Sequence, residues 1–171
     1  GNDRIALGDG DNFIDAGEGD NSVQTGDGTN IIKTGAGNDQ IDSGDGNNII
    51  SAGDGDNTVT AGDGLNQIYA GSGDDTITAG DGDNIINAGE GDNIVTTGDG
   101  ENQVFTDAGD DRITTSDGDN IINASGGDNI VTTGDGDNQV LTDAGDDQIT
   151  TGHGDNYISA GDGQNVIEAG D

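Results

Sequence analysis

The sequence predicts an all-β protein, a parallel β-solenoid built from a nine-residue repeat. Isoleucine or valine recurs every nine residues through all 171 residues, and a glycine always stands four residues before it. A further glycine precedes the first by two residues in most repeats, so each repeat joins a glycine-rich turn to a short β-branched strand. Glycine at this density disfavours helix, and a nine-residue period does not match helical spacing.

Alternation along each strand assigns the faces of the predicted sheets. The isoleucine or valine shares one face with the Asp or Asn two residues before it and a small residue two residues after it. We expect this face to be the inside, with a thin aliphatic core shared between neighbouring repeats. The expected core column is Ile5, Ile14, Val23, Ile32, Ile41, Ile50, Val59, Ile68, Ile77, Ile86, Val95, Val104, Ile113, Ile122, Val131, Val140, Ile149, Ile158 and Ile167.

A longer period predicts two repeats, or eighteen residues, per turn of the solenoid. The Asx position, two residues before each core residue, is aspartate only at every fourth repeat, 36 residues apart. Threonine directly follows the core residue in alternate repeats between residues 60 and 150. A triangular coil of three repeats per turn would mix these columns and is the less favoured alternative. Nineteen repeats then make about nine and a half turns, a rod of roughly 45 Å at ~4.8 Å per turn.

The composition restricts the class of protein and of partner. Hydrophobic residues make up 27%, aromatic residues 2%, and the net charge is −33, a balance that by itself predicts disorder. The strict repeat instead favours a folded array. Cysteine is absent, which excludes disulfides and thiolate metal sites. The charge repels nucleic acid and anionic membranes, and no apolar run approaches the ~20 residues of a membrane span, so cations are the expected partners.

Four segments resemble the RTX, or repeats-in-toxin, nonapeptide, whose consensus is GGxGxDxUx with U a large aliphatic residue. They are GAGNDQI (35–41), GSGDDTI (71–77), DAGDDRI (107–113) and DAGDDQI (143–149). The resemblance implies a right-handed parallel β-roll in which calcium ions lie in the turns between coils, held by the consensus aspartate and by backbone carbonyls. It also implies a secreted protein whose repeats order when calcium is met outside the cell.

The consensus aspartate is asparagine in fourteen repeats, and an amide oxygen is a weaker ligand for a hard cation. With two repeats per turn, the Asx positions form two columns. The Asn edge holds only asparagine, from Asn12 to Asn156, and is expected to be a metal-free amide ladder. The Asp edge alternates aspartate with asparagine, and we expect calcium there. The predicted ligands are Asp39, Asp75, Asp111 and Asp147, followed by Asp3, Asn57, Asn93 and Asn129.

An outer position, three residues before each Asx position, carries further turn carboxylates. Of the eighteen complete pairs of outer and Asx positions, sixteen hold one acid and none holds two. The outer acids of the Asn edge are a second candidate for metal binding: Asp9, Asp27, Asp45, Asp63, Asp81, Asp99, Asp117 and Asp135. Alternatively, these aspartates are solvated turn formers with sodium or potassium as diffuse counterions. His153 interrupts this column of aspartates, either as a tolerated substitution or, less favoured, in a catalytic or sensing role.

The outward faces of the two sheets are expected to differ. In the even-numbered repeats every strand shows an apolar residue outward, which suggests an association face, although strands favour such residues anyway. This face comprises Phe13, Ile31, Ile49, Tyr69, Ile85, Phe105, Ile121, Leu141 and Tyr157. The other sheet carries the threonine column, similar to ice-binding faces, but paired Thr-x-Thr strands occur only at residues 58–60 and 76–78.

The sequence predicts a structural function. Cysteine is absent, histidine is single and the carboxylates are repeated, so no catalytic constellation is expected and the chain is not expected to be an enzyme. We expect a secreted, calcium-stiffened rod of a filament, surface layer, matrix or adhesin stalk. The alternatives are a calcium-responsive folding module of a type I-secreted enzyme or toxin and, as a minor one, an ice-binding solenoid. Residues 1–171 are expected to form one uncapped solenoid of a longer array or assembly that associates end to end or sheet to sheet.

Overall fold

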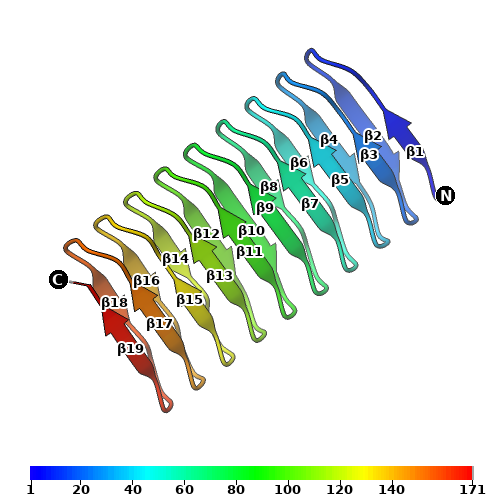
Figure 1. Ribbon diagram of the computed structural model, residues 1–171. Coiled ribbons are helices and arrows are strands. Elements are labelled where there is room, and N and C mark those ends of the chain that lie inside the picture. The colour runs from blue at the N-terminus through cyan, green and yellow to red at the C-terminus, as the bar shows by residue number, and fades with distance from the viewer. Residues whose placement is uncertain (171) are drawn as a thin grey trace.

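The computed structural model describes residues 1–170, which form nineteen short strands and the turns between them. Figure 1 shows the coils stacked in a straight row, with the N terminus and the C terminus at opposite ends of the rod. The strands are β1 (Arg4–Ala6), β2 (Phe13–Gly17), β3 (Ser22–Gln24), β4 (Ile31–Thr34), β5 (Gln40–Ser43), β6 (Ile49–Ser51), β7 (Thr58–Ala61), β8 (Gln67–Tyr69), β9 (Thr76–Ala79), β10 (Ile85–Gly89), β11 (Ile94–Thr97), β12 (Gln103–Thr106), β13 (Arg112–Thr115), β14 (Ile121–Asn123), β15 (Ile130–Thr132), β16 (Gln139–Leu141), β17 (Gln148–Thr151), β18 (Tyr157–Ser159) and β19 (Val166–Ala169).

The strands form two parallel sheets, one from the odd-numbered and one from the even-numbered strands. Each strand pairs with the strand two places further along the chain, in a register of eighteen residues that sets Ile41 beside Val59 and Ile50 beside Ile68. The predicted two-repeat turn is confirmed, and this pairing excludes the triangular coil. Residues eighteen apart in the sequence therefore lie one above the other along the rod.

The predicted core column lies between the two sheets except in the last strand, where Ile167 is 48% exposed because β19 is the edge strand of its sheet. From Ile14 to Ile149 every member of this column is at most 4% exposed, and the isoleucines and valines of the two sheets form one continuous cluster. Alternation holds within the strands: in β9, Ile77 is buried while Thr76 and Thr78 are exposed. Each coil contributes two large aliphatic residues, so the core is thin and depends on the coils stacked above and below.

The turns approach each other so closely that they require glycine. Gly37 has a φ of 141°, in the region that L residues rarely adopt, and a Cβ added there would lie 2.6 Å from the carbonyl oxygen of Gly19 in the preceding coil. The invariant glycine four residues before each core residue is thus a consequence of the stacking. Turns of the Asn edge lead into the even strands, and turns of the Asp edge lead into the odd strands.

Within residues 1–170 no helix is long and apolar enough to span a membrane.

Candidate functional site

The Asn edge is a ladder of buried side-chain amides. Asn66 is 0% exposed, and its Nδ2 donates to Gly62 O at 2.9 Å and Gly64 O at 3.3 Å, the carbonyls four and two residues earlier in its own turn. The same Nδ2 lies 2.9 Å from Oδ1 of Asn84 in the next coil, and the backbone N–H of Asn66 donates to that Oδ1 at 3.2 Å. One side chain therefore satisfies its own turn and joins two coils.

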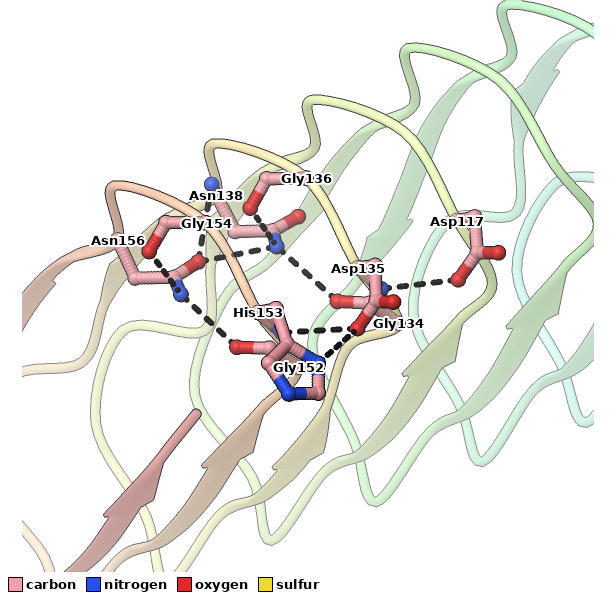
Figure 2. Close-up of polar contacts among 9 residues, drawn as sticks. All are labelled: Asp117, Gly134, Asp135, Gly136, Asn138, Gly152, His153, Gly154 and Asn156. Atoms are coloured by element: carbon pink, nitrogen blue, oxygen red, sulfur yellow. Dashed lines mark hydrogen bonds and ion pairs between the residues drawn. The ribbon is translucent and has the colours of Figure 1, made fainter. Parts of the chain in front are cut away.

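This ladder runs from Asn12 to Asn156. Successive Nδ2–Oδ1 distances are 2.8–3.0 Å along the whole column. Figure 2 shows one end of it, where the amide of Asn138 reaches Asn156 in the next coil and the carbonyls of Gly134 and Gly136 in its own turn. The expected amide ladder is present in the structure, and its polar atoms are satisfied by protein groups alone.

The Asp edge places carboxylates where the Asn edge has amides. Asp39, Asp75, Asp111 and Asp147 are 2%, 1%, 1% and 0% exposed. One oxygen of each continues the ladder: Oδ1 of Asp75 accepts the backbone N–H of Asn57 at 2.8 Å. In turn, the backbone N–H of Asp75 donates to Oδ1 of Asn93 at 3.0 Å. The four carboxylates are thus held at fixed positions inside the rod.

The second oxygen of these carboxylates differs from the amide that it replaces. Among the described residues, Oδ2 of Asp39, Asp75 and Asp111 is buried without a hydrogen-bond partner. The asparagines of this edge use the corresponding Nδ2 as a donor, as Asn57 does to Gly53 O at 3.0 Å and Gly55 O at 2.7 Å. Asp and Asn have the same shape, so an aspartate at this position has an acceptor oxygen where asparagine has a donor nitrogen.

Burial of these carboxylates disfavours their charged form. Burial raises the pKa of Asp75 to about 6, against hydrogen bonds from Asn57 that lower it. Burial also raises the pKa of Asp111. The nearby Thr106 hydroxyl and the hydrogen bonds from Asn93 lower this pKa and offset part of the rise. A buried carboxylate oxygen without a donor is costly, and either a proton or a cation removes the cost.

The groups around these oxygens fit a hard cation. Carboxylate and carbonyl oxygens are the ligands that calcium takes, six to eight at a time. No three His, Asp or Glu side chains within residues 1–170 lie close enough to form a metal site by themselves. A calcium ion on the Asp edge would therefore have one carboxylate ligand, with backbone carbonyls and water as the others. On the Asn edge the corresponding turn carbonyls accept hydrogen bonds from the asparagine amides, as Gly62 O and Gly64 O do from Asn66.

The remaining predicted ligands have other environments. Asp3 is exposed, in the first turn of the rod. Asn57, Asn93 and Asn129 are buried, but the oxygen of each accepts the backbone N–H of the aspartate one coil earlier, at 3.0 Å in every case. Their amide nitrogens face the turn carbonyls. The structure thus brings these asparagines next to the buried aspartates with their oxygens already in use.

The outer acids of the Asn edge are all exposed and form a second ladder. Oδ1 of each accepts the backbone N–H of the next outer residue, as Asp63 does from Asp81 at 2.9 Å. Within residues 1–170 the last residue of the column is His153, whose backbone N–H and Nδ1 lie 2.8 and 3.0 Å from Oδ1 of Asp135 (Figure 2). These bonds lower the pKa of Asp135, the backbone bond most. Turn formation thus accounts for this column without a bound ion.

Threonines that the sequence reading missed contact the Asp edge. The Thr142 hydroxyl donates to Oδ2 of Asp147 at 2.7 Å, which gives this carboxylate the donor that the other three lack. A signal was present in the sequence: threonine stands five residues before Asp39, Asp111 and Asp147, whereas alanine stands five residues before every asparagine of this edge. Ala70, five residues before Asp75, is the exception.

The predicted association face lies on the outside of the even-strand sheet. Phe13 is 76% and Tyr157 61% exposed; Ile31, Ile49, Tyr69 and Ile121 are exposed to a smaller extent. Ile85, Phe105 and Leu141 are half-buried. Asp83, Glu101 and Asp119 border the apolar groups, and with Leu65 and Gln103 they line a shallow hollow beside Ile85 and Ile121. Acidic side chains thus border the apolar groups at this hollow.

The nonapeptide repeat has a counterpart among known protein families. The family model of the RTX calcium-binding nonapeptide repeat (4 copies) matches residues 1–32, 24–59, 60–95, 96–131, 105–140 and 132–167. These matches together span the chain from residue 1 to residue 167. Neither a curated protein nor a solved structure matches it.

Proposed function

The chain belongs to the family of RTX calcium-binding nonapeptide repeats, and from this premise we propose that it is a structural rod stiffened by calcium ions on its Asp edge. Its ligands are the buried carboxylates of Asp39, Asp75, Asp111 and Asp147 with the carbonyls of their turns. Bound calcium compensates the negative charge of these buried carboxylates. The outer aspartates bind counterions diffusely.

The observation that carries this proposal is the buried, unpartnered Oδ2 of Asp39, Asp75 and Asp111 among the described residues. An oxygen in that state needs a proton or a cation, and at neutral pH a pKa of about 6, as at Asp75, favours the ionised form. Calcium present at millimolar concentration outside cells would then occupy sites of modest affinity.

A structural role agrees with the shape and the surface of the molecule. Figure 1 shows a straight stack of coils, and residues 1–170 carry turns of nearly constant length at both edges. Carboxylates recur along the rod without a unique cluster, in contrast to an active site. Extracellular placement in a filament, surface layer, matrix or adhesin stalk is the setting that fits a rod of net charge −33.

Association of rods would use the apolar stripe of the even-strand sheet. Two such faces pack side chain against side chain as the two sheets of a sandwich do. The acidic margin formed by Asp83, Glu101 and Asp119 repels a second copy unless cations lie between them. Association is therefore expected to require calcium and to weaken in its absence.

Calcium binding by the purified full chain, measured by equilibrium dialysis and calorimetry, tests the metal sites. A variant with Asp39, Asp75, Asp111 and Asp147 all replaced by Asn is expected to lose the calorimetric binding. The matched control replaces Asp45, Asp63, Asp81 and Asp99 of the outer column by Asn, which changes the charge equally and is expected to keep the binding. Loss of binding in the control alone would move the sites to the outer column.

Electron microscopy with calcium and with chelator tests the rod. Ordered fibres or sheets that form with calcium support a filament or surface layer. Discrete short rods under both conditions favour the alternative, a calcium-responsive folding module attached to a secreted enzyme or toxin.

A further inference from the structure

We propose that in every asparagine turn the side-chain amide takes the place of a calcium ion, so that these turns bind no metal and the solenoid folds before calcium arrives. The part that concerns metal-free folding is independent of the proposed function. The part that restricts calcium to the Asp turns rests on it.

The amide and the proposed ion satisfy the same backbone groups. On the Asn edge, Nδ2 of Asn48 donates to Gly44 O at 3.0 Å and Gly46 O at 3.1 Å. On the Asp edge, Asn93 does the same to Gly89 O at 3.2 Å and Gly91 O at 2.8 Å. One turn geometry therefore accepts either a pair of N–H donors or a cation, and the residue at the Asx position decides which.

An asparagine turn offers a metal no charged oxygen, and its amide and carbonyl oxygens already accept hydrogen bonds. Oδ1 of Asn84 accepts two donors from Asn66, the backbone N–H at 3.2 Å and Nδ2 at 2.9 Å. An amide oxygen has two lone pairs, so both are used. The carbonyls of Gly80 and Gly82 face the Asn84 amide at 3.1 and 2.9 Å. A cation that entered would displace these bonds and gain no negative charge from the side chain.

The outer position follows the same division. In the Asp turns it holds Ala36, Ser72, Ala108 or Ala144, so that the buried carboxylate is the only acid of its pair. In nearly all asparagine turns the acid is at the outer position and exposed. Sixteen of the eighteen pairs of outer and Asx positions thus hold one acid, which is buried where a cation is proposed and exposed where an amide fills the turn.

The proposed calcium sites are isolated from one another. Successive buried aspartates are 36 residues, or two coils, apart, which at ~4.8 Å per coil is about 10 Å. A neutral asparagine rung separates each pair, and physiological salt screens charges beyond about 8 Å. Independent binding is therefore expected, with a Hill coefficient of about 1.

The first test is far-UV circular dichroism of the full chain after chelation of calcium. A β spectrum with a cooperative thermal transition in chelator is the expected result, and calcium should raise the transition temperature without changing the spectrum. A coil spectrum in chelator that becomes β with calcium would overturn metal-free folding while leaving the calcium sites intact. A β spectrum with no calcium bound would overturn the proposed function while leaving the ladder intact.

The second test creates a calcium site on the Asn edge and, in a separate variant, removes one from the Asp edge. The double substitution Asp81→Ala with Asn84→Asp gives this turn the residue pair of Ala36 and Asp39 at unchanged net charge, and Asp81→Ala alone is the control. The double variant is expected to bind one calcium ion more than the control and to gain stability with calcium. The converse variant, Asp111→Asn, is expected to bind one ion fewer and to be folded in chelator. Unchanged stoichiometry in both variants would overturn the inference.

Discussion

The Asx side chains of the two edges differ in a single atom wherever the Asp edge has an aspartate, with large consequences. Both use the same glycine-rich turn and the same inward Asx side chain, and in both Oδ1 accepts a backbone N–H from the preceding coil, as in Asn84 and Asp75. The other branch is a nitrogen on the Asn edge and an oxygen at the aspartates. The nitrogen completes the hydrogen bonding of its turn, whereas the oxygen leaves its turn in need of a proton or a cation.

The comparison shows how a repeat can separate folding from ligand binding. The amide ladder joins the coils along the Asn edge, and its hydrogen bonds require no ion from the solvent. The Asp edge lacks the amide donor at every second coil, always between asparagines. No two buried carboxylates are therefore neighbours along this edge.

The largest expected effect comes from breaking the Asn ladder. Asn84→Ala removes the acceptor of the buried Asn66 backbone N–H and the donor to the half-buried Gly80 O and Gly82 O. We expect a loss of about 3 kcal/mol of stability, equal with and without calcium. Denaturant unfolding measures it, and the exposed Gln148→Ala is the control. A loss that calcium reverses would show that the Asn edge also binds metal.

The opposite change on the Asp edge should stabilise the metal-free rod. Asp75→Asn supplies a donor toward Gly71 O and Gly73 O, so we expect a gain of about 1–2 kcal/mol in chelator. In saturating calcium the gain should shrink or reverse because the variant lacks one bound ion. Thermal unfolding with calcium and with chelator measures the two differences. A variant that is less stable than the wild type in chelator would show that the amide does not stabilise the metal-free turn.

The metal-free rod should lose stability as the pH rises through the pKa of Asp75. Burial raises that pKa from 3.8 to about 6. Below pH 3.8 the group is protonated in both the folded and the unfolded state, and its contribution is fully present. Between these values only the unfolded state ionises, so stability declines with pH until about pH 6. The difference in unfolding free energy between the wild type and Asp75→Asn, followed from pH 4 to pH 8 in chelator, should grow accordingly.

A smaller effect should follow from giving Asp75 the hydroxyl that Asp147 already has. Ala70→Thr places a hydroxyl five residues before Asp75, as Thr142 stands before Asp147. We expect the pKa of Asp75 to fall and the stability of the metal-free rod at neutral pH to rise by about 1 kcal/mol. Carboxyl chemical shifts measured by NMR during a pH titration report the pKa. The conservative control is Ala70→Val, which has the shape but not the hydroxyl.

The smallest effect is expected at the end of the exposed outer column. His153→Ala removes the ring contact to Asp135 but keeps the backbone N–H that lowers the pKa of Asp135 most. The pKa of Asp135 should therefore rise only in part, and the thermal transition should not move measurably because both side chains are exposed. A clear change in calcium binding would instead give the outer column a role in the metal sites.

Much of the fold could be predicted because each part of it depends on local chemistry and on period. The glycine column follows from the close approach seen at Gly37, and the β-branched column from the core at Ile77. The 36-residue spacing of the aspartates, read against a nine-residue repeat, indicated the coil of eighteen residues. The contact of Thr142 with Asp147 could not be predicted from the repeat, because it joins the end of one strand to the following turn, five residues later.

The sequence by itself determined the solenoid, its core, the eighteen-residue coil and the division into two edges, because a period of nine with invariant glycine leaves few other ways to bury an aliphatic column. Only the tertiary structure decided what each turn oxygen and nitrogen contacts. These contacts join residues eighteen apart, and their polarity depends on which branch of the Asx side chain faces the carbonyls. Thus the outer aspartates became turn acceptors, and Asp39, Asp75 and Asp111 were left with the buried oxygens on which the proposed calcium sites depend.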